Sequence, residues 1–222
     1  MKNLARSILE SDPMDRYRPI AENNRKSLTK GSSVFCAGDP SNGLFLVLDG
    51  IMEIHAPNRF GEMILGHLYW ANQWIGAEAA LTAGFHYVSA TARTHLEIGI
   101  LSPSTLRQLA QNSPAIWRDI GCLAAEDQRL TCRCWLDATI RDPKHRIFAT
   151  LLRLTEGVSD ETSPCTVPVT QAELATMTNL CRNTAAKLLS DMADEGLIAA
   201  SYRGITIMSL ARMLERLEAF DE

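Results

Sequence analysis

The sequence predicts an α+β protein in which a jelly-roll-like β-roll is followed by a long helix and then by a small helical domain that ends in two strands. Short β-type runs separated by turn residues fill Ser33–Leu101, which is typical of a small antiparallel sandwich or barrel. From Ser104 onward apolar residues recur at helical spacing. Two helix starts, Ser113-Pro114 and Asp142-Pro143, divide this helical part. We therefore expect three parts, over residues 1–112, 113–141 and 142–222.

Composition and charge exclude several classes of protein. The chain has 222 residues, of which 46% are hydrophobic and 22% charged, so it can bury a real core. Its formal net charge of -4 argues against non-specific binding of nucleic acid by the whole molecule, but not against a local patch. No run reaches the ~18 to 20 apolar residues that span a bilayer, and the start lacks a signal-peptide block. We expect a cytoplasmic protein without a membrane contact.

The β-type runs show the alternation expected of half-buried strands. They read SSVFCAGDP, LFLVLDG, IMEIHA, EMILGHLYW, VSATA and LEIGIL. Turn pairs such as Asn42-Gly43 and Asp49-Gly50 separate them. After Pro103 this pattern ends.

The long helix should start at Ser113-Pro114 and run to about Ile140. Its apolar stripe recurs in steps of three, four or seven: Ile116, Ile120, Leu123, Leu130 and Cys134. A small sandwich cannot cover such a stripe over its whole length, so part of it is predicted to pack on a twin helix in a homodimer. An amphipathic helix that lies wholly within one chain stays open as the alternative.

The last third predicts a winged helix-turn-helix. Thr170 and Glu173 form a capping-box pattern at the start of a short helix. Asn179 can adopt the left-handed conformation of a tight turn, and a second helix follows and stops at Gly196. Two short strands around Arg203-Gly204 complete the wing.

The second helix of this motif carries the strongest functional signal. A helix that enters the major groove of DNA needs polar side chains in its first turns and apolar ones on its inner side. Arg182, Asn183 and Lys187 provide the polar face, and Arg182 suits the O6 and N7 atoms of guanine. Four neighbours are candidate phosphate contacts: Thr170, Gln171, Cys181 and Thr184.

Over nearly the whole chain these features resemble the cyclic-AMP receptor and fumarate-nitrate regulator family of bacterial transcription factors. FCAGDPSNGLFLVLDGIMEI is similar to the family's first strands, and the segment from SPAIW to DATI is similar to its dimer helix. CRNTAAKLL resembles the recognition-helix motif Ser-Arg-Glu-Thr-Val-x-Arg, with Asn183 in place of Glu and Lys187 in place of Arg. The resemblance implies a cyclic-nucleotide-binding-like sensor domain, a homodimer and a palindromic DNA operator. RNA polymerase and a small-molecule effector stay open as partners.

The sensor half departs from the pattern that the resemblance implies. Members that bind cyclic nucleotides carry Gly-Glu and then an Arg before Ser or Thr and Ala. Here Gly76 and Glu78 have one extra residue between them, and His86-Tyr87 occupies the region of the Arg, ahead of Ser89. Losing that guanidinium removes a charge-assisted pair worth about 1.5 to 3 kcal/mol, so cyclic AMP is disfavoured as the effector. Thr131-Cys132 falls where the family has a Thr-Ser pair that touches the adenine, but Thr in a packed helix is commonly a packing residue.

The effector therefore stays unknown. The first cysteine is Cys36, so no cluster of N-terminal ligands for an iron-sulfur centre is expected. Haem is disfavoured because histidines such as His86 are candidates by residue type alone. Cys132 and Cys134 point in different directions on a helix, although Cys134 could face its twin. We expect no metal site, because there is no paired Cys-x-x-Cys and no His-x-His.

Two other classes of function compete with a transcription regulator. An enzyme built on a jelly roll would need convergent His and Glu ligands or a nucleophile motif, and neither occurs. A regulatory nucleotide-binding or small-molecule-binding module that acts on a protein partner is the remaining alternative. Such a module has no use for Arg182 and Lys187 on an exposed helix start, so we expect a non-enzymatic, DNA-binding regulator.

Overall fold

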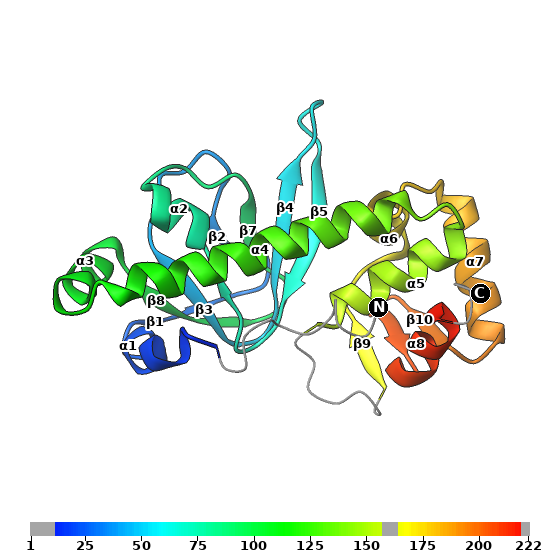
Figure 1. The fold of residues 1–222 in the computed structure, drawn as a ribbon. Helices are drawn as coiled ribbons and strands as arrows, with labels where there is room; N and C mark the ends of the chain where they lie inside the picture. The colour runs from blue at the N-terminus through cyan, green and yellow to red at the C-terminus, as the bar shows by residue number, and fades with distance from the viewer. Residues whose placement is uncertain (1–11, 157–163, 219–222) are drawn as a thin grey trace. The chain divides into compact units, whose positions relative to one another are not determined.

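The computed structural model describes residues 12–156 and 164–218 (Figure 1). Contacts group them into two compact units, which are described separately. The first holds the described residues up to Met63 together with His67–Thr131, and the second holds Ile64–Gly66 and the described residues from Cys132 onward. The division falls inside α4 (Ala115–Thr139) rather than at the expected boundaries after residues 112 and 141.

The β-roll consists of two four-stranded sheets. One has the order β1 (Arg25–Leu28), β8 (Leu96–Leu101), β3 (Leu44–Asp49) and β6 (Trp74–Ile75). The other has the order β2 (Ser33–Phe35), β7 (Ser89–Ala92), β4 (Met52–Pro57) and β5 (Met63–Tyr69). Short helical segments accompany the sheets: η1 (Asp15–Tyr17), α1 (Arg18–Glu22), α2 (Ala77–Thr82) and α3 (Pro103–Asn112). The expected jelly-roll-like architecture is confirmed.

Apolar side chains fill the interior of the β-roll. The alternation along the strands sends every second residue inward, as at Met52 and Ile54 of β4. The buried cluster between the sheets consists of Leu28, Phe35, Phe45, Val47, Met52, Ile54, Tyr69, Ile75, Ala90, Ala92, Leu96 and Ile98. Val88, which precedes β7, and Leu130 of α4 also pack against this cluster.

The first half of α4 packs on the β-roll of its own chain. Ile116 and Ile120 are completely buried in a second cluster, which also holds Leu44, Leu46 and Trp74. The expectation that Ile116 and Ile120 form a dimer interface is therefore wrong. The inner stripe of an amphipathic helix faces the nearest apolar surface, which here is the roll itself.

A buried carboxylate fastens the same stretch of α4 to the N-terminal segment. The Tyr17 hydroxyl donates a hydrogen bond of 2.8 Å to Asp119 Oδ2, and Arg16 forms an ion pair with the same oxygen at 2.8 Å. A buried carboxylate needs such partners, because an unpaired one would pay the full cost of desolvation.

The second unit is a winged helix-turn-helix, as expected. Its helices are α5 (Pro143–Leu154), α6 (Gln171–Met177), α7 (Arg182–Asp194) and α8 (Leu210–Glu218). Its sheet has the antiparallel order β10 (Ile198–Ser201), β11 (Gly204–Ile207) and β9 (Cys165–Val167). The three residues of β9 are too few to show an alternation, so the sequence did not predict this strand. Within the described residues, no helix is both long and apolar enough to cross a membrane.

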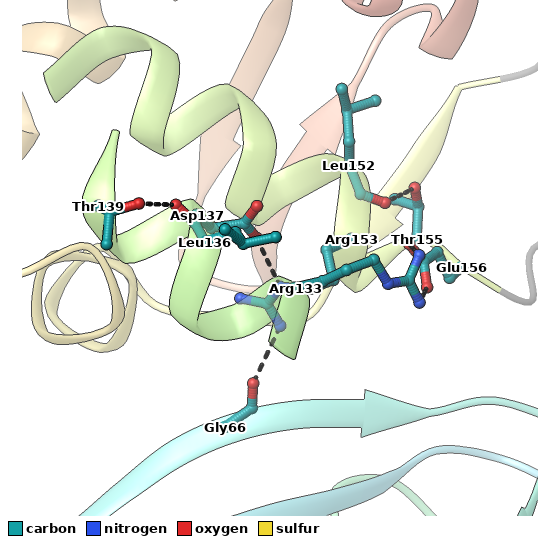
Figure 2. Close-up of polar contacts among 9 residues, drawn as sticks. All are labelled: Gly66, Arg133, Leu136, Asp137, Thr139, Leu152, Arg153, Thr155 and Glu156. Carbon is teal, nitrogen blue, oxygen red and sulfur yellow. Dashed lines mark hydrogen bonds and ion pairs between the residues drawn. The ribbon is translucent and has the colours of Figure 1, made fainter. Parts of the chain in front are cut away.

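Two ion pairs hold the end of α4 to α5. Arg153, which is almost fully buried, donates from Nε to Asp137 Oδ2 at 2.7 Å and from Nη1 to the Gly66 carbonyl oxygen at 3.1 Å (Figure 2). Arg133 forms a bidentate pair with Glu156. Both arginines join residues far apart in sequence, so they fix the packing of α4 on α5 within this unit.

We expect Gly43→Ala to destabilise the β-roll more than Gly61→Ala. Both glycines have a positive φ, +122° and +80°, so each substitution carries the backbone strain of about 1 kcal/mol. A Cβ at Gly43 would also overlap the Leu101 carbonyl oxygen, whereas no atom lies within 4 Å of a Cβ at Gly61. Urea unfolding should show a further loss of about 1 to 3 kcal/mol for Gly43→Ala. Equal losses for the two variants would contradict the close approach of β3 to β8.

Candidate nucleic-acid interface and sensor site

The helix α7 separates its polar and apolar residues as a groove-reading helix requires. Arg182, Asn183 and Lys187 are exposed. Ala185 and Leu189 are buried on the opposite side. Three of the residues predicted to contact DNA therefore lie together on one accessible face of the same helix.

Cys181 and Thr184 form a small polar group at the start of α7. Cys181 is the N-cap residue, and its Sγ lies 3.0 Å from Thr184 Oγ1. The hydrogen bond from the Thr184 side chain and those from the backbone lower the pKa of the exposed Cys181 thiol. The predicted pair is brought together by the structure.

Thr170 and Gln171 lie at the start of α6, and their side chains differ in how free they are to contact a phosphate. Thr170 Oγ1 accepts a hydrogen bond from the Glu173 backbone N–H at 3.1 Å, and the Thr170 backbone N–H donates to Glu173 Oε2 at 2.7 Å, which completes the expected capping box. The Thr170 hydroxyl also donates to Glu173 Oε2 at 2.9 Å. Its hydroxyl therefore serves its own helix, while the Gln171 side chain is exposed.

The wing presents a cation that the sequence analysis located but did not assign to a contact. Tyr202 is 87% exposed between β10 and β11. The Arg203 guanidinium lies 5.4 Å from the centre of the Tyr202 ring, and its Nε donates to the Tyr202 hydroxyl at 2.8 Å. An aromatic ring beneath a guanidinium restricts its motion, so the wing tip carries a pre-oriented positive charge. An Arg in a turn between two strands is the sequence signal that could have revealed it.

The structure scatters the predicted effector residues of the β-roll. Gly76 has a φ of +99° and precedes α2, and a Cβ there would lie 2.9 Å from the Gly43 carbonyl oxygen. Glu78 is exposed, whereas the residue directly after Gly76 is the buried Ala77. The position of the expected acid is thus apolar.

His86 and Tyr87 do not act together. His86 is buried, stacks on Phe35 with a 3.8 Å separation of ring centres, and its Nε2 lies 2.9 Å from Asn42 Oδ1. Burial lowers the pKa of His86, although the nearby Asp39 acts in the opposite direction. Tyr87 is exposed. His86 is therefore a structural histidine with its ring committed to two neighbours.

The other predicted effector residues are either hydrogen-bonded within the chain or exposed. The Ser89 hydroxyl accepts a hydrogen bond from the Ala37 backbone at 3.0 Å. Directly before Ser89 stands Val88, which packs on the apolar interior of the roll where the family pattern has its Arg. Thr131 is exposed, and its hydroxyl donates to the Asp127 carbonyl oxygen at 3.0 Å. Cys132 is also exposed.

An arginine that follows Ser89 in the sequence is paired with an acid. Arg93 follows β7 and forms an ion pair of 2.7 Å with Glu53 of β4, and both side chains are mostly buried. Among the described residues, no three His, Cys, Asp or Glu side chains gather as a metal site requires.

The predicted dimer stripe faces the interior of the protein in its first half. Leu123 and Leu130 pack against the two clusters of the β-roll. Cys134 is half-buried, and burial raises the pKa of its thiol, which makes it a weak nucleophile. The exposed large apolar residues of α4 are Trp117, Trp135 and Leu136, which lie on a different side of the helix.

Comparison with protein families finds two matches. The Crp-like helix-turn-helix domain matches residues 145–216, and the cyclic nucleotide-binding domain matches residues 25–113. These ranges coincide with the winged unit and with the β-roll.

Known proteins of similar sequence are bacterial regulators. The cAMP-activated global transcriptional regulator Vfr of Pseudomonas aeruginosa is 25% identical over 190 residues, which cover 81% of this chain and 86% of Vfr. The CRP-like protein Clp of Xanthomonas campestris is 26% identical over 209 residues, which cover 90% and 89%.

Solved structures share the fold. FixK2 of Bradyrhizobium japonicum has a TM-score of 0.73 at 16% identity, over 86% of this chain and 96% of FixK2. A CRP/FNR-family transcriptional regulator of Thermus thermophilus has a TM-score of 0.69 at 23% identity, over 88% and 98%.

Proposed function

This chain belongs to the CRP/FNR family of transcription regulators, and on that premise we propose that it is a homodimer that binds a palindromic operator in double-stranded DNA. The observation that carries the proposal is the exposed polar face of α7, which begins with Arg182 and Asn183. A regulator of this family is not an enzyme. We propose that it acts in the cytoplasm, with RNA polymerase as a partner at the promoter.

The wing supplements the base contacts of α7. In a winged motif the recognition helix enters the major groove, and cations near it neutralise phosphates. Lys187 of α7 is suited to a contact in the groove. Arg203, which lies against Tyr202 on the wing, is suited to neutralise a phosphate. Phosphate contacts fix the register of the protein, whereas Arg182 and Asn183 supply the sequence preference.

The dimer interface is proposed on the exposed side of α4. From Trp117 the residues on this side follow one another in steps of four, seven, three and four: Trp117, Gly121, Gln128, Thr131 and Trp135. This is the spacing of a helix that packs on a twin, with a large aromatic side chain at each end. The 67% exposed fraction of Trp135 in the single chain supports a partner for this side.

The sensor is proposed not to respond to cyclic AMP. Vfr is cAMP-activated, and the solved Xanthomonas Clp is described as responsive to c-di-GMP, so relatives differ in effector. Here Ala77 and Val88 replace the acid and the guanidinium of the nucleotide pattern, and apolar side chains fill the roll. Without that guanidinium a buried cyclic phosphate loses a pair worth about 1.5 to 3 kcal/mol. The natural effector is unknown, and we propose neither haem nor an iron-sulfur cluster.

Arg182→Ala should weaken operator binding by about 1 to 3 kcal/mol and relax the preference at one guanine in each half-site. Asn183 can bracket adenine through N6 and N7, whereas a Glu only accepts and suits cytosine N4. Selection from random DNA should therefore return different consensus sequences for the wild type and Asn183→Glu. An identical consensus would show that Asn183 reads no base.

Trp135→Glu should dissociate the dimer in sedimentation experiments at micromolar concentration. Truncating a hot-spot aromatic side chain in an interface costs about 2 kcal/mol or more. Phe85→Glu is the matched control, because Phe85 is a similarly exposed aromatic residue on the β-roll. The wild type should protect two half-sites about 10 base pairs apart. A wild-type monomer that binds DNA as a monomer would contradict the proposed assembly.

Cyclic AMP should leave operator affinity unchanged. Calorimetry should detect at most weak binding, because no guanidinium meets the cyclic phosphate in the pattern Val88-Ser89-Ala90. A micromolar or tighter dissociation constant, accompanied by a marked gain in operator affinity, would show that another residue replaces the missing Arg.

A further inference from the structure

Two acids interrupt the inner stripe of α4, and one of them is Asp119, which Tyr17 and Arg16 hold. Ile116, Ile120, Leu123 and Leu130 follow one another in steps of four, three and seven, and all four pack on the β-roll. Within the step of seven, Asp127 lies four residues after Leu123 and three residues before Leu130, on the same face. An apolar residue there would continue the stripe, so the carboxyl group is an exception that needs a physical role.

Asp127 contacts the β-roll through β5. The Tyr69 hydroxyl donates a hydrogen bond of 2.9 Å to Asp127 Oδ1. Tyr69 is buried in the apolar interior of the roll, against which Leu130 of the next helical turn also packs. The ring of His67, another buried residue of β5, meets the Tyr69 ring edge-on at 5.3 Å. Titratable groups thus gather where α4 meets the roll.

Burial and a neighbouring acid favour the neutral form of Asp127. On α4 the neighbouring Glu126 is an acid, and the Arg129 Nη1 atom lies 3.9 Å from the Glu126 carboxylate. On β5 the facing groups are Tyr69 and His67. Burial raises the pKa of Asp127 to about 7, helped by Glu126 and opposed by the Tyr69 hydrogen bond.

On β4, the strand beside β5, the inward residue Ile54 belongs to the apolar interior. Glu53 of β4 forms its ion pair with Arg93 instead. The polar side chains next to Ile54 on this strand, Glu53 and His55, alternate with it and so belong to the other face of the sheet. The groups that act on Asp127 are therefore those of α4 and β5.

We propose that Asp127 is a proton-binding site through which the regulator responds to pH: the neutral carboxyl group seats α4 on the β-roll, and the carboxylate loosens it. The proton comes from solvent and returns to it. This inference rests on the proposed function in one respect, because a seated α4 is taken to present its exposed side to the twin helix and so to favour operator binding.

The direction of the pH dependence follows from the pKa of Asp127 in the two states of the helix. A seated Asp127 has a pKa near 7, whereas a solvated one has the ordinary pKa of 3.8. Between pH 3.8 and about pH 7, only the seated state keeps the proton. The free energy that favours the seated state therefore falls as the pH rises. Above about pH 7 it falls no further, because both states are then deprotonated. From about pH 6 to about pH 8 the ratio of loosened to seated molecules should rise about tenfold.

The first test measures the proton directly, in the full chain without DNA. Carbon-13 NMR of the Asp127 carboxyl group should give a midpoint near 7. Tyr69→Phe should move the midpoint to higher pH, because it removes a hydrogen bond that stabilises the carboxylate. Glu126→Gln should move the midpoint to lower pH, because it removes a neighbouring negative charge. A midpoint below about 5 would overturn the proposal.

The second test links the proton to DNA. Operator affinity of the wild type should fall by up to about tenfold from pH 6 to pH 8, and Asp127→Asn should lose this dependence while its amide oxygen still accepts from Tyr69. A dependence that persists in Asp127→Asn, and that His67→Gln removes, would assign the proton to His67 and overturn the proposal. A midpoint near 7 together with operator binding that does not depend on pH would also overturn the proposal. Failure to bind DNA at any pH would overturn the proposed function instead, since the NMR midpoint needs no DNA.

Discussion

The packing of α4 on the β-roll is the constraint on which the rest of the structure depends. The helix has one side for its own chain, anchored by Ile116 and Ile120, and another that leaves Trp117 and Trp135 exposed. Because the first side is satisfied inside the chain, the second is free for a partner. A stripe that was expected to join two chains thus closes the core of one, and the Asp119 carboxylate with Tyr17 and Arg16 fastens it there.

The same packing places apolar side chains at positions of the cyclic-nucleotide pattern. A nucleotide-binding roll keeps polar groups near its helix, whereas this one brings Leu130 and Val88 against an apolar interior. His86, which replaces no ligand, spends its ring on Phe35 and Asn42. Farther along the helix, the Tyr69–Asp127 hydrogen bond is a polar contact between α4 and this apolar interior.

The winged unit shows how local chemistry prepares a binding surface. The capping box of Thr170 and Glu173 defines the start of α6, and Asn179 makes the turn with a φ of +51°. These local devices set α7 after a tight turn, with Arg182 at its first position. In the same unit, Arg153 binds Asp137 and the Gly66 carbonyl oxygen and so holds the end of α4 (Figure 2).

The sequence by itself determined the elements whose causes are local. Period-two runs, Pro at helix starts and the capping box each act within a few residues, so the β-roll, the long helix and the winged motif with Arg182 were predictable. Only the tertiary structure decided which surface each helical face meets. Helical spacing shows that Ile116 and Leu130 share a side, but not whether that side packs on a roll or on a twin. The burial of His86, the ion pairs of Arg153 and the partner of Asp127 depend on residues tens of positions away, because the contacts that set their environment form only when the chain folds.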